Sequence, residues 1–484
     1  MKKMPVDNPG DFLSSNRMKR PDTKSENERS GKRLPVGWII DVTVSSLNPE
    51  GYGVATYEGL SVLVTGALPG EEVRAKVTFT GRREVYADVV KVMRRSNSRL
   101  VAPPCSRPPS CDGCPLVPMN YPSQLVWKKG LVEREVRRFA SLRDTIVHDV
   151  IASPEPVSYR TSAKLVITGK FAEPLIGIYR RNSHDVVDIS DCPLHHPLIN
   201  RIAQVVKEGI KKGKVPIFSL RNGNGLLRYL VIRVSATMNK AMVVFVTSMR
   251  SFNEIHHLAK YLQEKVPEVA VVVQNVNKSA GNVIMGQQDH YLTTTRVLTE
   301  KVGNVSFNVS PRSFFQVNTK AAQIIYEKVR EWGIHSGKEA VVDLYCGVGG
   351  ISLFLAPKVR EVLGIEVVEA AVADAELNAS ANGVGNARFV AGDASDILKG
   401  LSLQKVTIDL LVINPPRKGC DEKVLLHASA IAPAKIIYVS CSPFTLARDL
   451  DILSGKGYRT VAIQPVDMFP QTAHIENVAL LERR

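Results

Sequence analysis

The feature that most constrains the fold is a regular alternation of strand-like and helix-like segments in the last third of the chain. Strand-like apolar runs lie at residues 340–344, 362–365, 387–390, 408–413 and 435–440, and helix-like stretches at residues 351–355, 370–382 and 443–454. Such alternation predicts a parallel, doubly wound sheet covered by helices. Because ligands of these sheets bind at the carboxyl ends of the strands, the residues that follow each strand are the first candidates for a functional site.

A glycine-rich turn follows the first strand and indicates a cofactor. The strand ends at Asp343, and the turn at residues 345–350 contains glycines that let a backbone bend tightly and approach a ligand closely. A dinucleotide fingerprint would place glycine or alanine at position 352, where this chain has Ser352. The next two strands lead to Glu366 and Asp393, which can accept hydrogen bonds from ribose hydroxyls and an adenine amino group. Acids at these three positions favour S-adenosyl-L-methionine over a nicotinamide cofactor.

The fourth and fifth strands lead into residues that suit methyl transfer. Asn414-Pro415-Pro416 follows the fourth strand, and this turn by itself is typical of amino methyltransferases. Cys441 follows the fifth strand directly before a helix, where the positive end of the helix dipole favours the thiolate over a usual pKa of about 8.5. Glu476 opens a last strand near the C-terminus.

A thiolate and a carboxylate beside a methyl donor predict methylation of uracil at C5. Uracil C5 is a poor nucleophile, so a thiolate must first add to C6 to activate the ring. A base must then remove the C5 proton so that the thiolate can leave. In this interpretation Cys441 is the nucleophile and Glu476 is the base. An amino methyltransferase would instead use Asn414-Pro415-Pro416 and leave Cys441 idle.

The preceding part of the chain predicts two further domains. Residues 35–97 alternate short apolar segments with glycine and proline turns, which is typical of a small OB-like barrel that binds nucleic acid. Residues 98–310 predict an α+β central domain, and residues 311–484 form the predicted catalytic domain. A helix at residues 121–140, with Lys128 off its apolar face, is expected to pack on the catalytic domain.

Charge and hydropathy indicate the compartment and the partner. The formal net charge is +16, from 63 Lys and Arg against 47 Asp and Glu, and such an excess attracts polyanions such as nucleic acid. No apolar run approaches the ~18 residues of a membrane-spanning helix. Residues 1–34 lack apolar periodicity and predict a flexible basic tail rather than a signal peptide. We expect a cytoplasmic protein without a membrane partner, and we infer no obligate protein partner.

Five motifs of the chain resemble, in the same order, those of the RNA uridine-5-methyltransferase family. They are SPRSFFQVN at residues 310–318, DLYCGVGG at 343–350, NPPRKG at 414–419, SCSPFTLARDL at 440–450 and DMFPQTAHIE at 467–476. The likeness covers residues 36–484. It implies a multidomain protein with an N-terminal TRAM barrel, a central domain and a Rossmann-like methyltransferase domain that acts on RNA.

The resemblance also implies roles for single residues. Cys441 falls on the family's nucleophile and Glu476 on its base. The family's positions that contact S-adenosyl-L-methionine are matched by Gln316, Tyr345, Gly350, Glu366 and Asp393. The family usually has aspartate where this chain has Asn414, which keeps an acceptor for the cofactor or the uracil edge but loses the charge.

Four cysteines outside these motifs predict a metal site: Cys105, Cys111, Cys114 and Cys192. A Cys-x2-Cys pair with two further cysteines indicates a four-thiolate site, and spacing alone suits both zinc and an iron-sulfur cluster. The resemblance implies the second, because one branch of the family carries a 4Fe-4S cluster on cysteines so arranged. Cys346 is expected to be a packing residue, and Cys420 to be incidental.

The RNA substrate is expected to present its uridine in a loop or flipped out of the base stack, because a buried thiolate cannot reach C5 inside the stack. The resemblance favours 23S ribosomal RNA, with the T-loop of transfer RNA as the alternative. Basic residues of the central domain are expected to hold the RNA backbone: Arg160, Lys164, Arg180, Arg181, Arg228 and Arg233.

Two other classes of protein remain open at this stage. An RNA cytosine-5-methyltransferase uses the same thiolate chemistry but normally has a second cysteine after a proline, whereas Cys420 follows a glycine. A non-enzymatic RNA-binding or redox-sensing cluster protein would need none of Gln316, Glu366 or Glu476.

Overall fold

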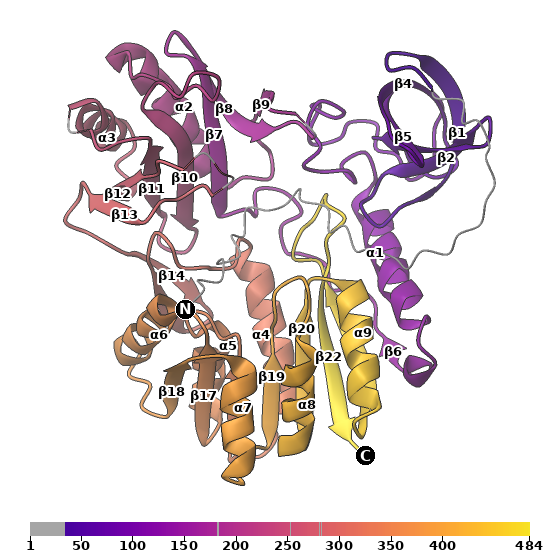
Figure 1. Ribbon diagram of the computed structural model, residues 1–484, viewed down its shortest axis with the longest axis vertical. Coiled ribbons are helices and arrows are strands. Elements are labelled where there is room, and N and C mark those ends of the chain that lie inside the picture. The colour runs from indigo at the N-terminus through magenta and orange to yellow at the C-terminus, as the bar shows by residue number, and fades with distance from the viewer. Residues whose placement is uncertain (1–33, 182, 252, 280, 282) are drawn as a thin grey trace.

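The computed structural model describes residues 34–181, 183–251, 253–279, 281 and 283–484, so the predicted tail lies outside the described residues apart from Leu34. Figure 1 shows a small barrel, a central sheet and a larger sheet covered by helices. None of the helices in the described part of the chain combines the length and the apolar character needed to cross a lipid bilayer.

The first folded part is a closed barrel with the strand order β1-β2-β3-β5-β4. Its strands are β1 (Ile39–Leu47), β2 (Gly53–Tyr57), β3 (Leu60–Thr65), β4 (Glu72–Thr80) and β5 (Glu84–Arg94). Ile40, Val42 and Val44 alternate with exposed residues along β1 and fill the barrel core, as the period of two of a strand requires. The predicted barrel is confirmed.

The central sheet has the strand order β13-β12-β11-β10-β7-β8-β9. Its elements are β7 (Ser162–Lys170), β8 (Glu173–Tyr179), β9 (Val186–Asp188), α2 (Pro197–Gly213), β10 (Leu227–Ser235), β11 (Lys240–Thr247), α3 (Asn253–Lys265), β12 (Val269–Val276) and β13 (Gln288–Tyr291). Both helices pack on one face, where they bury Leu230, Ile232 and Val234 of β10. The alternate residues Val231 and Arg233 therefore belong to the opposite face.

The large sheet has the strand order β18-β17-β16-β19-β20-β22-β21-β6. Its strands are β6 (Ile146–Val147), β16 (Ala340–Leu344), β17 (Glu361–Glu366), β18 (Ala387–Ala391), β19 (Leu410–Ile413), β20 (Lys435–Ser440), β21 (Tyr458–Val466) and β22 (Glu476–Arg483). The strands from β18 to β20 are parallel, which confirms the predicted sheet, and β22 lies antiparallel between β20 and β21. A hairpin of β14 (Leu298–Val302) and β15 (Val305–Val309) connects this sheet with the central one.

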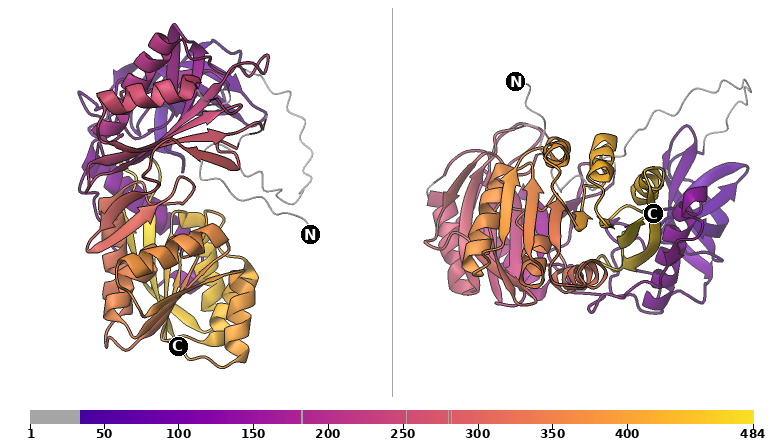
Figure 2. Two further views of the ribbon diagram at one scale, coloured as in Figure 1. Left: turned by 90° about the vertical axis from the view of Figure 1, so that its left-hand side faces the viewer. Right: turned by 90° about the horizontal axis from the view of Figure 1, so that it is seen from below.

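Helices lie on both faces of this sheet (Figure 2). One face carries α4 (Thr319–Gly333), α5 (Gly350–Leu355) and α6 (Glu369–Ala381), and the other carries α7 (Ala394–Leu403), α8 (Glu422–Ile431) and α9 (Pro443–Ser454). Successive residues of a strand alternate between the two cores: Val341 packs in the first and Val342 in the second. The helices thus cover both faces and leave the carboxyl edge of the sheet for ligands.

Helix α1 (Tyr121–Val136) precedes the central sheet in the sequence but packs on α9 of the catalytic domain (Figure 1). Val132 and Val136 enter the same apolar core as Leu450 of α9. The expectation that Lys128 lies off the packed face is wrong, because its side chain is fully buried. The reason is an acidic partner far away in the sequence, which helical periodicity does not reveal.

Candidate active site

Most of the predicted site residues follow the parallel strands of the large sheet, so the fold brings them to one edge. Glu366 is the last residue of β17, Asn414 follows β19, and Cys441 follows β20. Tyr345 comes directly after β16, and Asp393 stands two residues after β18. Because these strands are parallel neighbours, their carboxyl ends lie at the same edge.

The turn after β16 has the backbone geometry of a ligand-binding turn. Gly347 and Gly349 have φ angles of 56° and 84°, and Tyr345 has 62°, a left-handed conformation that residues other than glycine rarely adopt. A Cβ atom at Gly350 would lie 2.6 Å from the hydroxyl of Tyr326, so only glycine fits there without a shift. A Cβ atom at Gly347 would meet nothing within 4 Å, so there is open space beside the turn.

Asp343 fixes the end of this turn through hydrogen bonds with Ser352. Its side chain is buried, and Oδ2 accepts hydrogen bonds from the amide of Ser352 at 3.1 Å and from its hydroxyl at 2.6 Å. Burial raises the pKa of Asp343 to about 7, although the two bonds from Ser352 oppose the rise. The serine that excludes a dinucleotide fingerprint thus holds the start of α5 to the end of β16.

Glu366 and Asp393 offer acceptor oxygens at the carboxyl edge of the sheet. Glu366 accepts from the amide of Gly347 through Oε2 at 3.1 Å and from the amide of Val368 through Oε1 at 3.0 Å. Asp393 caps α7, where Oδ1 accepts from the amide of Ser395 at 2.8 Å. A carboxylate has about four lone-pair positions. Both residues therefore keep acceptor capacity for a ligand with ribose hydroxyls, which fits S-adenosyl-L-methionine.

The other two predicted cofactor residues, Gln316 and Asn414, lie in different surroundings from Glu366 and Asp393. Gln316 lies on the segment between β15 and α4 and lines a pocket with Phe315 and Arg233, at the junction of the central sheet and the catalytic domain. Asn414 is half-buried, and its backbone N–H donates to the carbonyl of Leu344 at 3.3 Å. Contacts of these two side chains with the cofactor stay predictions.

Cys441 and Glu476 are brought together by the pairing of β20 with β22. The antiparallel register pairs Ser440 with Asn477, so Cys441 comes beside Glu476, the first residue of β22. The side-chain amide of Asn477 donates to the carbonyl of Ser440 at 3.1 Å and holds the two strand ends together. The nucleophile and base predicted from separate motifs are therefore neighbours at the carboxyl edge.

Burial sets the protonation of both groups. The pKa of Glu476 rises to about 8, mainly because the carboxyl is buried, while the charge of Arg417 opposes the rise. The pKa of Cys441 rises to about 12 through burial and the nearby charge of Glu476, again opposed by Arg417. A base with a pKa near neutrality suits proton abstraction at physiological pH.

The expectation that the helix dipole favours the Cys441 thiolate is wrong for the free protein. Ser442 caps α9, and its hydroxyl accepts from the amide of Thr445 at 3.3 Å. Desolvation and the adjacent carboxylate outweigh the dipole, which acts only within the first helical turn. In the free protein these effects therefore favour the protonated thiol.

Arg417 is a candidate functional residue that the motif analysis missed. Its positive charge lowers the pKa of both Cys441 and Glu476, so it lies close to both side chains. The signal was present in the sequence, because Arg417 stands within NPPRKG directly after the fourth strand. Without the tertiary structure, however, nothing linked this arginine to the two reacting groups.

The two remaining cysteines of the catalytic domain are both buried. Cys346 packs in the core beneath the glycine turn. The amide of Cys420 donates to Asp449 at 2.8 Å, and its side chain packs in the core that contains Tyr438. Burial raises the pKa of Cys420 to about 12. These surroundings suit packing residues.

The four cysteines outside the catalytic domain line one pocket: Cys105, Cys111, Cys114 and Cys192. Burial and the neighbouring thiols raise the pKa of Cys114. Within the described residues, no group of three or more His, Cys, Asp or Glu side chains has an arrangement that could hold a metal ion. Four cysteines around one pocket are the donor set of a four-thiolate centre, although their sulfur atoms do not have the arrangement of a bound ion.

The basic residues expected to hold RNA have different roles in the structure. Arg228 is buried and donates to the carbonyls of Asn277 at 2.6 Å and Ser279 at 2.8 Å, so the expectation that it holds the RNA backbone is wrong. The guanidinium of Arg181 lies 4.7 Å from the ring centroid of Tyr52 and links the central domain with the barrel.

Arg233 and Lys164 form a basic pair on the sheet face opposite α2 and α3. Lys164 of β7 pairs with Val231 of β10, two residues from Arg233. Nε of Arg233 is buried without a hydrogen-bond partner, and burial lowers the pKa of Arg233 to about 10. Burial and the charge of Arg233 lower the pKa of Lys164 to about 8. Burial of two adjacent cations costs free energy because both lose water. An anionic ligand would offset that cost, so the pair suits an anion.

Comparisons with known proteins agree with this geometry. Residues 120–484 match the family described as tRNA (uracil-5-)-methyltransferase, and residues 33–90 match the TRAM domain. An uncharacterized RNA methyltransferase of Geobacter sulfurreducens is 55% identical over 97% of this chain and 94% of its own length. The crystal structure of Pyrococcus abyssi tRNA (uracil-54, C5)-methyltransferase in complex with S-adenosyl-L-homocysteine is 27% identical, covers 91% of this chain and 100% of that chain, and has a TM-score of 0.74.

The raised pKa of Cys441 predicts slow alkylation in the free protein. Its reaction with iodoacetamide should accelerate about tenfold per pH unit between pH 7 and pH 9, because only the thiolate reacts. Glu476→Gln should speed the reaction at pH 9 by removing a neighbouring negative charge, whereas Glu366→Gln should not. Peptide mass spectrometry measures the rate at Cys441. Rapid alkylation at pH 7 without pH dependence would show a preformed thiolate.

Proposed function

Because this chain belongs to the tRNA (uracil-5-)-methyltransferase family and is an RNA (uracil-5-)-methyltransferase that uses S-adenosyl-L-methionine, we propose that it methylates C5 of one uridine in 23S ribosomal RNA in the cytoplasm. The observation that carries the proposed chemistry is the position of Cys441 beside Glu476 at the cofactor edge of the sheet. A thiol and a carboxyl with a pKa of about 8 are the two groups that the reaction needs.

The proposed reaction uses these groups in order. The Cys441 thiol first gives up its proton to water. Sγ of the thiolate then adds to C6 of the uracil, and the ring electrons move to C5 and O4 as an enolate. S-adenosyl-L-methionine, when bound, would supply the methyl group to C5 and would leave as S-adenosyl-L-homocysteine. The Glu476 carboxylate then takes the C5 proton, the C5–C6 double bond re-forms, and the thiolate leaves. Arg417 is close enough to both groups to stabilise negative charge on either.

The cofactor is proposed to bind at the glycine turn. Glu366 and Asp393 accept hydrogen bonds from its ribose and adenine, and the open space beside Gly347 leaves room for it. Tyr345, Gln316 and Asn414 complete the proposed contacts. The neutral amide of Asn414 provides both an acceptor and a donor, whereas the family's usual aspartate provides only acceptors when it is ionised.

Exchange of the nucleophile and exchange of the base should give different defects. Cys441→Ala should abolish both the covalent adduct and 5-methyluridine. Glu476→Gln should still form the adduct and transfer the methyl group, but should trap the methylated RNA on the protein because the C5 proton stays in place. Nucleoside mass spectrometry and denaturing gels measure the two products. Cys420→Ala is the matched control and should keep activity, and equal activity of Cys441→Ala would refute the mechanism.

The same assay on 23S ribosomal RNA and on transfer RNA separates the two candidate substrates. The T-loop of transfer RNA is the second candidate, because the similar Pyrococcus abyssi enzyme is a tRNA (uracil-54, C5)-methyltransferase. The preference for 23S ribosomal RNA rests on the resemblance to relatives that carry an iron-sulfur cluster. A cytosine-5 reaction is disfavoured because Cys420 is buried against Asp449.

The RNA backbone is proposed to contact the pair of Lys164 and Arg233. Exchange of both residues for methionine should weaken RNA binding and reduce the slope of log K against log salt by about 1 to 2 units. It should also remove the gain in stability between pH 8 and pH 10.5, where the folded chain binds fewer protons than the unfolded chain because the pKa of Lys164 is lowered to about 8 from 10.5.

Fluorescence anisotropy over a salt series measures the first effect, and chemical denaturation over a pH series measures the second. The charge-matched control is Lys211→Met with Lys265→Met, on the helices of the opposite face. An unchanged affinity and salt slope in the Lys164 and Arg233 double variant would exclude this surface.

We propose that Cys105, Cys111, Cys114 and Cys192 hold a 4Fe-4S cluster that ties the loop at residues 101–119 to the central domain. The anaerobically purified protein should contain iron and sulfide and be brown, and Cys192→Ser should lose both and melt at a lower temperature. Elemental analysis, visible absorption and calorimetry measure these properties, with Cys420→Ser as the control. A colourless, air-stable protein with stoichiometric zinc would contradict the assignment.

A further inference from the structure

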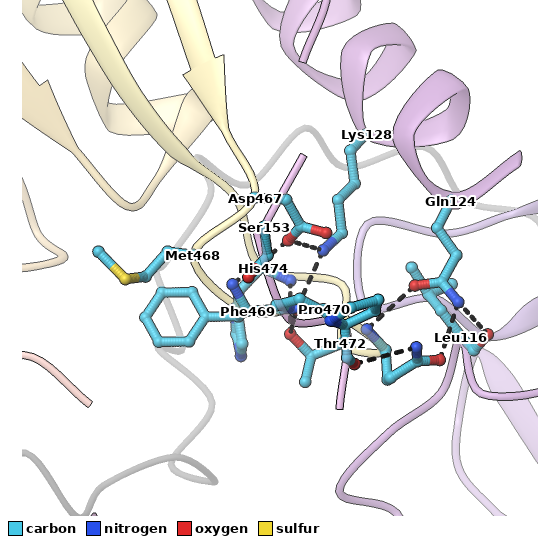
Figure 3. A network of polar contacts seen from close by, with 12 residues as sticks. Leu116, Gln124, Lys128, Ser153, Asp467, Met468, Phe469, Pro470, Thr472 and His474 are labelled. Atoms are coloured by element: carbon cyan, nitrogen blue, oxygen red, sulfur yellow. Dashed lines mark hydrogen bonds and ion pairs between the residues drawn. The ribbon is translucent and has the colours of Figure 1, made fainter. Parts of the chain in front are cut away.

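Lys128 is a fully buried cation on α1, a helix that precedes the catalytic domain in the sequence. Its Nζ atom lies 2.6 Å from Oδ1 of Asp467 and donates to the carbonyl of Phe469 at 3.0 Å, and neither Lys128 nor Asp467 is exposed to solvent. Figure 3 shows α1 reaching over the segment at residues 467–475, which joins β21 to β22.

Gln124, one turn earlier on α1, forms hydrogen bonds with the same segment. Its amide nitrogen donates to Oε1 of Gln471 at 2.9 Å, and its amide oxygen accepts from the backbone amide of Gln471 at 3.0 Å. The same nitrogen also donates to the carbonyls of Leu116 and Met119. Gln471 has a φ of 69°, so these bonds hold a conformation that glutamine rarely adopts.

Four successive carbonyls of this segment accept bonds from outside it. Asn318 donates to Met468 at 3.0 Å, Lys128 to Phe469 at 3.0 Å, the Tyr159 hydroxyl to Pro470 at 3.1 Å, and the Leu116 amide to Gln471 at 3.1 Å. Three of the four donors precede the catalytic domain in the sequence. The path of the segment is therefore set from outside the methyltransferase sheet.

The held segment ends at Glu476. Val466, the last residue of β21, pairs with Glu476, the first residue of β22, so the segment closes the connection between them. A buried ion pair contributes little net stability compared with apolar packing, but it fixes geometry strongly because its atoms must meet at a set distance. An ion pair at this position therefore suits a role in orientation.

We propose that Lys128 and Gln124, together with the hydroxyl of Tyr159, act as positioning residues that hold the segment at residues 467–475 so that the Glu476 carboxylate reaches the C5 proton. This inference rests on the proposed role of Glu476 as the base. Nothing in the known motifs assigns a role to any of these residues, because all three lie outside them. Their exchange should slow proton removal more than addition of Cys441 or methyl transfer.

Accumulation of the covalent adduct is a readout that a merely structural role would not produce. Lys128→Met, Gln124→Leu and Tyr159→Phe should each form the adduct with RNA and S-adenosyl-L-methionine, but should release 5-methyluridine up to ~100-fold more slowly, because small displacements of a reacting group have effects of this size. Denaturing gels and single-turnover kinetics measure the trapped and released RNA. Tyr159→Phe removes only one hydroxyl and should fold even if the loss of Lys128 leaves Asp467 buried and uncompensated.

Lys129→Met is the matched control. Lys129 is the next residue on α1 and forms an ion pair with the exposed Asp149 at 2.6 Å, so its exchange should leave both steps unchanged. Glu476→Gln, measured in parallel, separates the two hypotheses. If Glu476→Gln traps no adduct, the proposed base is wrong. If Glu476→Gln traps the adduct and the folded Gln124→Leu and Tyr159→Phe variants do not, the positioning role is wrong.

Discussion

The active site depends on the antiparallel insertion of β22 between two strands that run the other way. A parallel strand delivers its last residue to the carboxyl edge of a sheet, whereas an antiparallel neighbour delivers its first residue there. The pairing of Ser440 with Asn477 therefore brings Cys441, just after one strand, beside Glu476, at the start of the other. No rearrangement is needed to join the proposed nucleophile and the proposed base, because the hydrogen-bond register of the sheet already does so.

Burial at this edge raises the pKa of both groups, so near neutral pH the thiol is protonated and the carboxyl is only partly ionised. The pKa of Cys441 rises to about 12, which keeps the thiol protonated and protects it from side reactions before RNA binds. The pKa of Glu476 rises to about 8, which places the base close to the working pH. The positive charge of Arg417 opposes the rise of both pKa values. This residue of the loop after β19 therefore partly offsets the cost of burying the ionised forms of Cys441 and Glu476.

The site is completed by segments outside the methyltransferase sheet. Helix α1 supplies Lys128 and Gln124, the cysteine loop supplies Leu116, and the start of the central domain supplies Tyr159, all to the connection before Glu476. The proposed cluster lies close to this network, because Cys114 is only two residues from Leu116. Segments that come early in the chain thus hold the connection that leads into the last strand, β22.

The sequence alone determined the parallel sheet, the barrel and the positions of Glu366, Asp393 and Cys441 at strand ends, because hydrophobic period and strand order are local properties. Only the tertiary structure decided which groups meet and how they titrate. Lys128 was expected off the packed face, yet it is buried against Asp467, 339 residues away in the sequence. The shift of the Cys441 pKa likewise depends on desolvation and on Glu476, which are contributed by distant segments, whereas a motif reveals only the adjoining helix.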